Sequence, residues 1–199
     1  MSARNTNRTD GSGPVTLAVT SGKGGVGKTS VVVNLAVALA RQHNRVAILD
    51  ADFGLGNVDV LLGLTPAAHL GHVLAGERRM HEIVVEGPHG VQILPASSGL
   101  RELTALTARQ WDRLRRGLEE IGTNLDFLLV DTGAGISSNV IEMVGGVERA
   151  LVVTSVEPTA VVDAYAVIKI LTTAQPTQEV GVLVNGAREA GEHSWPHPE

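Results

Sequence analysis

A glycine-rich segment, residues 21–30, limits the folds that this chain can adopt. It follows the apolar run 15–19 directly and opens the helix-like run 31–40. From Gly22 to Thr29 the residues fit the pattern G-x-x-x-x-G-K-[ST], with the strand before and the helix after that the pattern requires. Successive backbone N–H groups can point into one concavity only where no Cβ intervenes, so glycines are needed. The segment predicts a phosphate-binding loop, and the alternative is a plain glycine-rich turn.

Lys28 and Thr29 follow the last glycine of this loop, at the expected start of the helix. The first N–H groups of a helix lack partners, and the helix dipole places positive charge at that end, so both features attract a triphosphate. In loops of this pattern the lysine contacts the β- and γ-phosphates, and the hydroxyl contacts Mg²⁺. We therefore expect Lys28 on phosphate and Thr29 on the metal.

A further candidate residue is Asp131, which ends the apolar run 128–130 and precedes the small-residue turn 132–135. An acid at a strand end can hold Mg²⁺ through a coordinated water, because Mg²⁺ keeps several waters and takes few protein ligands. This is the arrangement of a Walker B acid followed by a switch loop. The alternative is an aspartate that caps the following helix.

Three acids cluster in the segment 50–59, near the end of another apolar run. Phosphoryl transfer depends on placement and electrostatics more than on a strong base, so Asp52 is the candidate for positioning the attacking water. Asp50 is a candidate to assist from the strand, including as a ligand near the metal. Asp59 is better explained as a helix cap or a surface charge.

Lys23 stands five positions before Lys28, so the loop reads KGGVGKT. This resembles the deviant Walker A signature of the MinD/ParA family of ATPases. The segments DADFGLGNVDVLLGL, LLVDTGAGIS and EPTAVVDAYAVIKIL are similar to the FlhG/FleN branch of that family, which regulates flagellar number and placement. These motifs span nearly the whole chain. For Lys23 alone, a solvated surface lysine is the alternative.

The resemblance implies roles for individual positions. It implies a nucleotide-sandwich dimer in which Lys23 reaches the partner's phosphates, where a desolvated cation lowers the barrier as an arginine finger does. It also implies Asp52 as the hydrolytic residue, and Asp131 and Gly133 in the Walker B strand and second switch. The residues that it implies for the phosphate cradle are Gly24, Gly25, Val26, Gly27, Lys28, Thr29 and Ser30.

The resemblance further implies ATP and Mg²⁺ as cofactors, Asn185 against the adenine, and Glu157 near the dimer interface. Relatives continue well past this asparagine and end in an amphipathic membrane-binding helix. The segment 190–199 contains prolines and no apolar periodicity, which argues against such a helix and against membrane binding by this chain. Since relatives continue further past the asparagine, we also expect the adenine pocket to be incomplete.

Apolar runs bounded by turn signals predict six buried strands, at residues 15–20, 46–50, 91–95, 125–131, 150–155 and 180–185. Helical patterns lie between them. This alternation predicts an α/β fold, with a mostly parallel sheet and helices on both faces. The resemblance specifies a P-loop NTPase of the deviant Walker A, SIMIBI-like type, shortened at its C-terminus.

One predicted helix has Val161, Ala164, Tyr165 and Ile168 on its inner face. Between the second and third apolar runs we expect a short helix within residues 66–76 and a short extended piece at 83–85. Ligands of parallel sheets bind at the carboxyl ends of the strands, so the acids and the phosphate loop should converge there.

The composition is that of one globular domain: 199 residues, of which 43% are hydrophobic and 19% charged. We expect a flexible N-terminal tail at residues 1–13, the ATPase domain at 14–188 and a polar C-terminal tail at 189–199. The chain contains no cysteine, which excludes disulfides and thiolate metal sites within it and indicates a cytoplasmic location. The net charge of −5 argues against a nucleic-acid-binding surface.

His69, His72, His81 and His89 lie in one irregular region. No nearby acid or cysteine completes a ligand set with clear spacing, so we expect surface histidines rather than a metal site.

These observations predict a Mg²⁺-dependent ATPase that dimerises with ATP and acts on a protein partner, such as a flagellar transcription regulator or an SRP-type GTPase. Two alternatives stay open. One is a truncated nucleotide- or partner-binding module without turnover. The other is a ParA-type partition ATPase, which needs a basic surface for nonspecific DNA binding.

Overall fold

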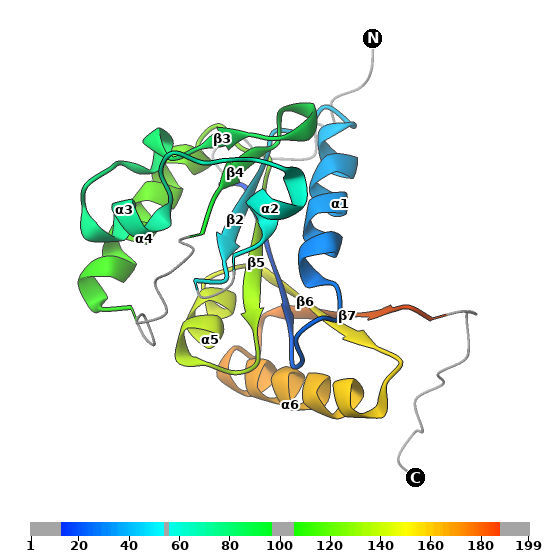
Figure 1. Cartoon of the computed structure of the whole chain (residues 1–199). Helices are drawn as coiled ribbons and strands as arrows, with labels where there is room; N and C mark the ends of the chain where they lie inside the picture. The colour runs from blue at the N-terminus through cyan, green and yellow to red at the C-terminus, as the bar shows by residue number, and fades with distance from the viewer. Residues whose placement is uncertain (1–12, 54–55, 97–105, 188–199) are drawn as a thin grey trace.

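The computed structural model describes residues 13–53, 56–96 and 106–187. Seven strands form a single sheet in the order β3-β4-β2-β5-β1-β6-β7 (Figure 1). All neighbouring strands run parallel except β3 and β4. The strands are β1 (Val15–Ser21), β2 (Val46–Ala51), β3 (Val85–Glu86), β4 (Gln92–Leu94), β5 (Phe127–Ala134), β6 (Arg149–Ser155) and β7 (Glu179–Asn185).

Six of these strands overlap the predicted apolar runs, whereas β3 shares only Val85 with the extended piece expected at residues 83–85. The predicted tails fall outside the described residues, apart from Gly13. The helices are α1 (Lys28–Ala40), α2 (Val58–Leu62), α3 (Leu70–Ala75), α4 (Ala108–Gly122), α5 (Ser138–Gly145) and α6 (Pro158–Ala174), with short 3-10 turns η1 (Met80–Glu82) and η2 (Pro88–Gly90).

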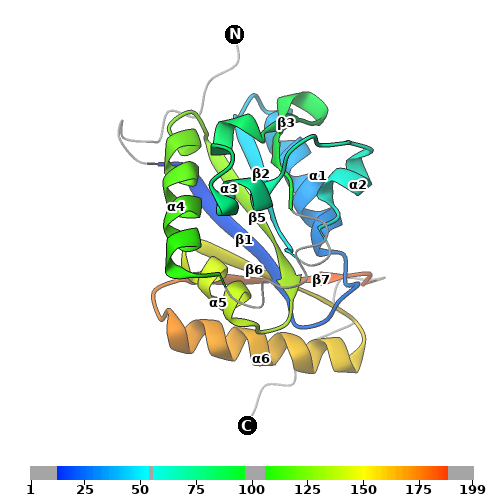
Figure 2. The ribbon, with the colours of Figure 1, turned by 60° about the vertical axis from the view of Figure 1, so that its left-hand side comes forward.

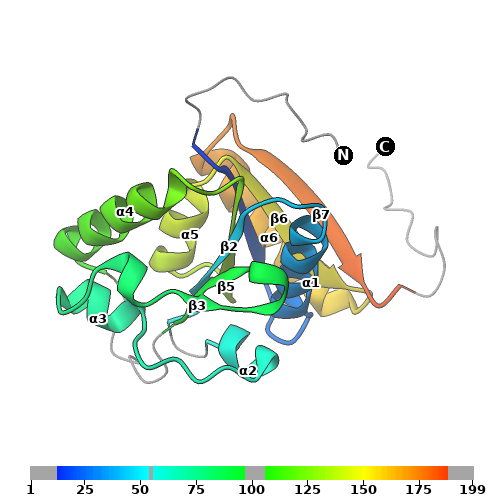
Figure 3. The same cartoon turned by 90° about the horizontal axis from the view of Figure 1, so that it is seen from above.

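Helices cover both faces of the sheet, as predicted. Alternate residues of β2 show this: Ile48 packs in a cluster with Val32 and Ala36 of α1, whereas Leu49 packs in a cluster with Leu114 of α4 and Met143 of α5. Figures 2 and 3 show α1 on one side of the sheet and α4 and α5 on the other. Because both faces are buried, the strands need continuously apolar sequences.

The prediction of which α6 residues face inward is only partly right. Tyr165 is 56% exposed, and the helix instead buries Ala160, Ala164, Val167 and Leu171. The helix also passes close to the chain just after β1, where a Cβ added to Gly22 would lie 2.3 Å from the backbone carbonyl carbon of Asp163. Tyr165 is two positions beyond Asp163, about 200° around the helix, so it lies on the other side of α6 from this contact.

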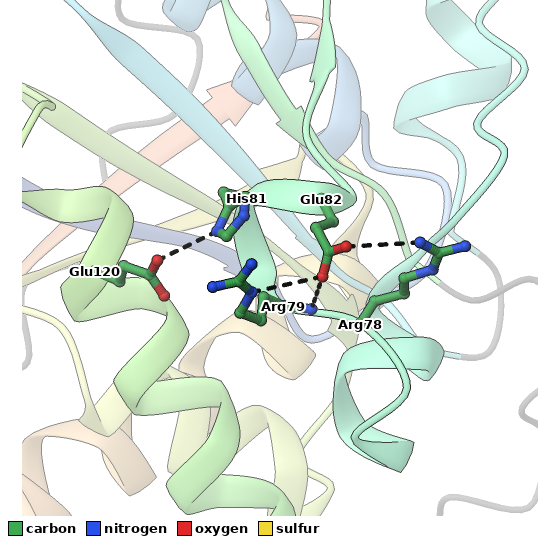
Figure 4. A network of polar contacts seen from close by, with 5 residues as sticks. All are labelled: Arg78, Arg79, His81, Glu82 and Glu120. Atoms are coloured by element: carbon green, nitrogen blue, oxygen red, sulfur yellow. Dashed lines mark hydrogen bonds and ion pairs between the residues drawn. The ribbon is translucent and has the colours of Figure 1, made fainter.

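Polar contacts join the segment around η1 to α4 (Figure 4). His81 Nδ1 lies 3.2 Å from Glu120 Oε1, and Glu82 Oε2 accepts a hydrogen bond of 2.7 Å from the backbone N–H of Arg79. This hydrogen bond, with the nearby arginines, holds the pKa of Glu82 below its usual value. His81 thus serves as a surface side chain that pairs with a helix residue.

His69 and His72 also have local structural roles. His69 Nδ1 accepts a hydrogen bond of 3.2 Å from Gly71 N, and His72 Nδ1 accepts one of 3.2 Å from His69 N, so together they cap the start of α3. Burial is the main reason that the pKa of His69 is lowered. Over the three described segments, no helix is both long and apolar enough to cross a membrane.

Candidate functional site

A cavity of about 760 Å³ opens at the carboxyl ends of β1, β2 and β5. Parallel pairing brings these three ends together, since Asp131 of β5 lies in register with Val19 of β1 and Asp50 of β2. Of the predicted residues, the cavity is lined by Gly24, Gly25, Gly27, Lys28, Thr29, Ser30, Asp52 and Gly133.

A second cavity, of about 1480 Å³, lies between α4 and α5. Its lining is largely apolar, with Leu114, Leu128 and Met143 among its residues, and it contains no predicted site residue. Size alone therefore does not identify the functional site. The smaller cavity combines backbone donors, a lysine and an acid, which is the chemistry that an anionic ligand needs.

The loop backbone faces the smaller cavity in a conformation that requires glycine. Gly25 and Gly27 have φ of +78° and +96°, in the left-handed region that other residues rarely adopt. Gly27 is the N-cap of α1, and no side chain caps this helix, so its first N–H groups remain available to a ligand. A Cβ added at Gly24 or Gly25 would meet no atom within 4 Å.

Lys28 begins α1 and lies close to two acids from neighbouring strand ends. Burial lowers the pKa of its ammonium group, and the negative charges of Asp131 and Asp52 oppose that shift. A lysine partly removed from water at the base of a phosphate loop is a strong electrostatic partner for a phosphate.

Asp131 is 2% exposed and lies behind Thr29, whose hydroxyl donates a hydrogen bond to it. Burial raises the pKa of Asp131 to about 6, while Thr29 and the charge of Lys28 act in the opposite direction. Its Oδ1 atom is buried without a hydrogen-bond partner. A buried carboxylate oxygen without a partner fits a cation, and an aspartate beside a threonine hydroxyl is an oxygen donor set that suits Mg²⁺.

Asp50 has different surroundings, although it is also buried at a strand end. Its two carboxylate oxygens accept hydrogen bonds of 3.2 Å from the backbone N–H groups of Asp52 and Val58. Burial raises the pKa of Asp50 to about 7, and the two backbone hydrogen bonds oppose this shift. Asp50 does not line the cavity.

Lys23 lies outside the cavity lining and contacts the start of α6 instead. Its Nζ forms an ion pair with Glu157 and donates a hydrogen bond of 3.3 Å to Thr159 Oγ1. The hydrogen bond and the positive charge of Lys23 lower the pKa of Glu157. The sequence resemblance implied that Lys23 and Glu157 lie at a dimer interface. Within one chain, their side chains contact each other.

Asn185 is placed at the end of β7, where its side chain holds the phosphate loop. Its Nδ2 donates a hydrogen bond of 2.9 Å to the backbone carbonyl of Val26, and a Cβ at Gly27 would lie 2.5 Å from that nitrogen. The side chain of Val26 packs in the core beneath the loop. Neither Asn185 nor Val26 lines the cavity.

The cavity also contains residues that the sequence interpretation did not single out. Asn57 is the N-cap residue of α2, and Ser137 caps α5 with a hydrogen bond of 3.4 Å from Val140 N to its hydroxyl. Asn139 lies in the first turn of α5 and accepts a hydrogen bond of 3.0 Å from Leu106 N. Ser137 follows the glycines at 133 and 135, and serine is a common N-cap residue. The sequence could therefore have indicated that α5 begins next to the site.

Comparison with known proteins identifies the family. Residues 14–193 match the family model described as ParA, NUBPL iron-transfer P-loop NTPase. The Antiactivator FleN of Pseudomonas aeruginosa is 47% identical over 176 residues, which cover 88% of this chain and 63% of FleN. The Flagellum site-determining protein YlxH of Helicobacter pylori is 38% identical over 156 residues, which cover 77% of this chain and 52% of YlxH.

The chain thus spans less than two thirds of the length of these two relatives. Among solved structures, the septum site-determining protein MinD of Pyrococcus horikoshii, complexed with Mg-ADP, superposes with a TM-score of 0.77 at 26% identity. The superposition covers 92% of this chain and 74% of that one. The phosphate loop, the sheet order and these similarities agree, and the chain belongs to the ParA/MinD family of P-loop NTPases.

Proposed function

We propose that this chain binds ATP with Mg²⁺ in the cavity beside the phosphate loop and hydrolyses it, and that the protein works as an ATP-dependent dimerisation switch. The observation that carries the proposal is the convergence of loop amides, Lys28, Thr29 and Asp52 on one cavity, with the unpartnered oxygen of Asp131 directly behind Thr29. Each of these groups has a place in phosphoryl transfer.

The proposed roles follow from position. The first N–H groups of α1 and the ammonium group of Lys28 bind the phosphates, which are the only strongly anionic part of the nucleotide. Thr29 and Asp131 would hold Mg²⁺, which neutralises charge on the phosphate oxygens when bound. Asp52 reaches the same cavity from the end of β2 and orients the attacking water. Asn185 supports the loop from β7.

The dimer part of the proposal concerns Lys23. In one chain its ammonium group is paired with Glu157 at the start of α6. In an ATP-bound dimer Lys23 exchanges this partner for the phosphates of the other copy, so the γ-phosphate favours the dimer and its loss releases the partners. FleN is named an antiactivator and YlxH a flagellum site-determining protein. We extend this to a cytoplasmic role in flagellar number or placement, through a protein partner such as a transcription regulator or an SRP-type GTPase.

The hydrolysis part is tested by measuring phosphate release from ATP with Mg²⁺, using Lys28→Ala as the inactive control. We expect turnover by the wild type that the variant lacks, and turnover equal to that of Lys28→Ala would contradict the proposal. Calorimetric titration with a non-hydrolysable ATP analogue is run in parallel. Binding without turnover would instead indicate a nucleotide-binding module.

A further inference from the structure

Two buried aspartates, Asp50 and Asp131, face each other across neighbouring strands at the site. They lie in register where β2 pairs with β5, and they are 1% and 2% exposed. From the sequence both were candidates near the metal, Asp131 as the Walker B acid and Asp50 as an assisting residue. Their hydrogen-bond partners are different, and the difference separates their roles.

The carboxylate of Asp50 is occupied by the backbone of its own chain. Oδ1 accepts a hydrogen bond of 3.2 Å from Asp52 N, and Oδ2 accepts one of 3.2 Å from Val58 N. These two amides stand at the start and the end of the loop that joins β2 to α2. One side chain therefore holds both ends of the loop. By contrast, Oδ1 of Asp131 is buried without a partner.

The loop also packs directly on this carboxylate. A Cβ built on Gly56 would lie 3.0 Å from Asp50 Oδ2 and 2.3 Å from Ala96 Cβ. Only a residue without a side chain fits between the carboxylate of Asp50 and Ala96, two residues after the end of β4. The loop is thus held by two amide hydrogen bonds and by close packing, and Asp52, which lines the nucleotide cavity, is its first anchored residue.

We propose that Asp50 is a positioning residue, which anchors Asp52 and the start of α2 at Val58 so that the carboxylate of Asp52 faces the cavity, while Thr29 and Asp131 provide the protein's oxygens for the metal. Asp50 acts through Asp52 and does not touch the nucleotide. The kinetic part of this inference depends on the proposed ATPase activity. The anchoring part depends only on the contacts of Asp50.

Hydrogen exchange tests the anchoring without any nucleotide. In Asp50→Asn one oxygen can still accept, but the new NH₂ group opposes a backbone N–H, so one of the two hydrogen bonds is lost. We expect exchange of the amide that loses its acceptor, at Asp52 or Val58, to become roughly tenfold faster, since one hydrogen bond is at stake. Asp59→Asn is the matched control: it lies in the same segment and its Oδ1 accepts a hydrogen bond from Val60 N, 2.8 Å away. In Asp59→Asn the amides of Asp52 and Val58 should exchange at the wild-type rate.

Kinetics separate positioning from metal binding. We expect Asp50→Asn to lower kcat by up to roughly 100-fold, the effect of misplacing a group that orients a reactant, with KM for ATP and the Mg²⁺ dependence nearly unchanged. Asp131→Asn should instead raise the Mg²⁺ concentration needed for half-maximal activity. Gly56→Ala keeps every acid, but its Cβ would lie 3.0 Å from Asp50 Oδ2 and push the chain away from that carboxylate. It should therefore lower kcat as Asp50→Asn does, and it provides the test if Asp50→Asn fails to fold.

The inference would be overturned if the amide hydrogens of Asp52 and Val58 exchanged at the wild-type rate in folded Asp50→Asn. A shift of its Mg²⁺ dependence to match Asp131→Asn would overturn it as well, because Asp50 would then act as a metal ligand. If the wild type hydrolyses no ATP, the proposed function fails, and the exchange experiment alone decides whether Asp50 anchors the loop.

Discussion

At the scale of single residues, three ionisable groups under the phosphate loop are buried, and burial disfavours their charged forms. Asp131 and Asp50 both have raised pKa values, of about 6 and about 7, and burial is the first cause for each. Burial also lowers the pKa of Lys28, because it disfavours the charged ammonium group. A site that holds buried charge in this way is less stable when empty than when a cation and a phosphate complete it.

The raised pKa of Asp131 predicts a pH effect on the stability of the empty protein. Below about pH 4 the carboxyl is protonated in both the folded and the unfolded state, and no cost arises. Between the ordinary pKa of 3.8 and the folded-state pKa of about 6, the carboxyl is ionised in the unfolded chain but protonated in the folded one, so the free energy of unfolding falls over this pH range and is level above it. Asp131→Asn removes this cost, and we expect it to be on the order of 1–3 kcal/mol more stable than the wild type at pH 8 but similar at pH 4.

Urea unfolding in EDTA at several pH values measures this difference. Asp59→Asn is the control, and its unfolding free energy should follow the wild-type pH curve. An equal gap between Asp131→Asn and the wild type at both ends of the pH range would contradict the prediction. Added Mg²⁺ and ATP should stabilise the wild type more than Asp131→Asn, because the bound cation needs the carboxylate.

At the scale of elements, the start of the phosphate loop and α6 are in direct backbone contact. Gly22 lies against Asp163, and Lys23, the next residue, pairs with Glu157 at the N-cap of the same helix. The exposed side of α6 presents Val162 and Tyr165, which are 67% and 56% exposed. A change in the loop on nucleotide binding would therefore reach α6 without passing through intervening elements.

This contact predicts that Gly22→Ala is destabilising. Its Cβ would lie 2.3 Å from the carbonyl carbon of Asp163, and a backbone atom cannot move aside as a flexible side chain can. We expect a loss of about 1–3 kcal/mol in the free energy of unfolding, the usual cost of overpacking. Gly24→Ala is the control for the nucleotide-free protein, since its Cβ would meet no atom within 4 Å. Equal stability of the two variants in chemical denaturation would show that α6 does not pack closely on the loop.

At the scale of the whole molecule, the cavity lies at the carboxyl ends of the central strands β2, β5 and β1, and Lys23 lies outside its lining. The proposed dimer would bring a second copy to this end of the sheet. The chain has a mass of 20.8 kDa. If Asp52 orients the attacking water as proposed, Asp52→Ala should bind ATP but hydrolyse it slowly. We then expect this variant to show twice the mass of one chain with ATP and Mg²⁺, and the mass of one chain with ADP or without nucleotide.

Light scattering coupled to size-exclusion chromatography makes this measurement. The double variant Lys23→Ala, Asp52→Ala should stay at the single mass with ATP, because the cation that would bridge the two copies is missing. A mass that is the same in all three nucleotide states of Asp52→Ala would contradict the dimerisation switch.

The sequence by itself determined the sheet, the position of the phosphate loop and most of the cavity lining. These are local properties: apolar runs form buried strands, and glycines, Lys28 and Thr29 follow one another along the chain, so their spacing is readable without a fold. The fold class could be predicted for the same reason, because strands alternating with helices admit few arrangements.

Only the tertiary structure decided what depends on contacts between distant segments. It shows that Asp50 accepts hydrogen bonds from backbone amides while Asp131 keeps a buried oxygen without a partner, although the sequence made both acids candidates near the metal. It likewise leaves Tyr165 exposed and buries Ala160, Ala164, Val167 and Leu171, because the rest of the fold decides which side of α6 is covered. Burial and hydrogen-bond partners set the role of a charged group, and both are fixed by packing in three dimensions rather than by order along the chain.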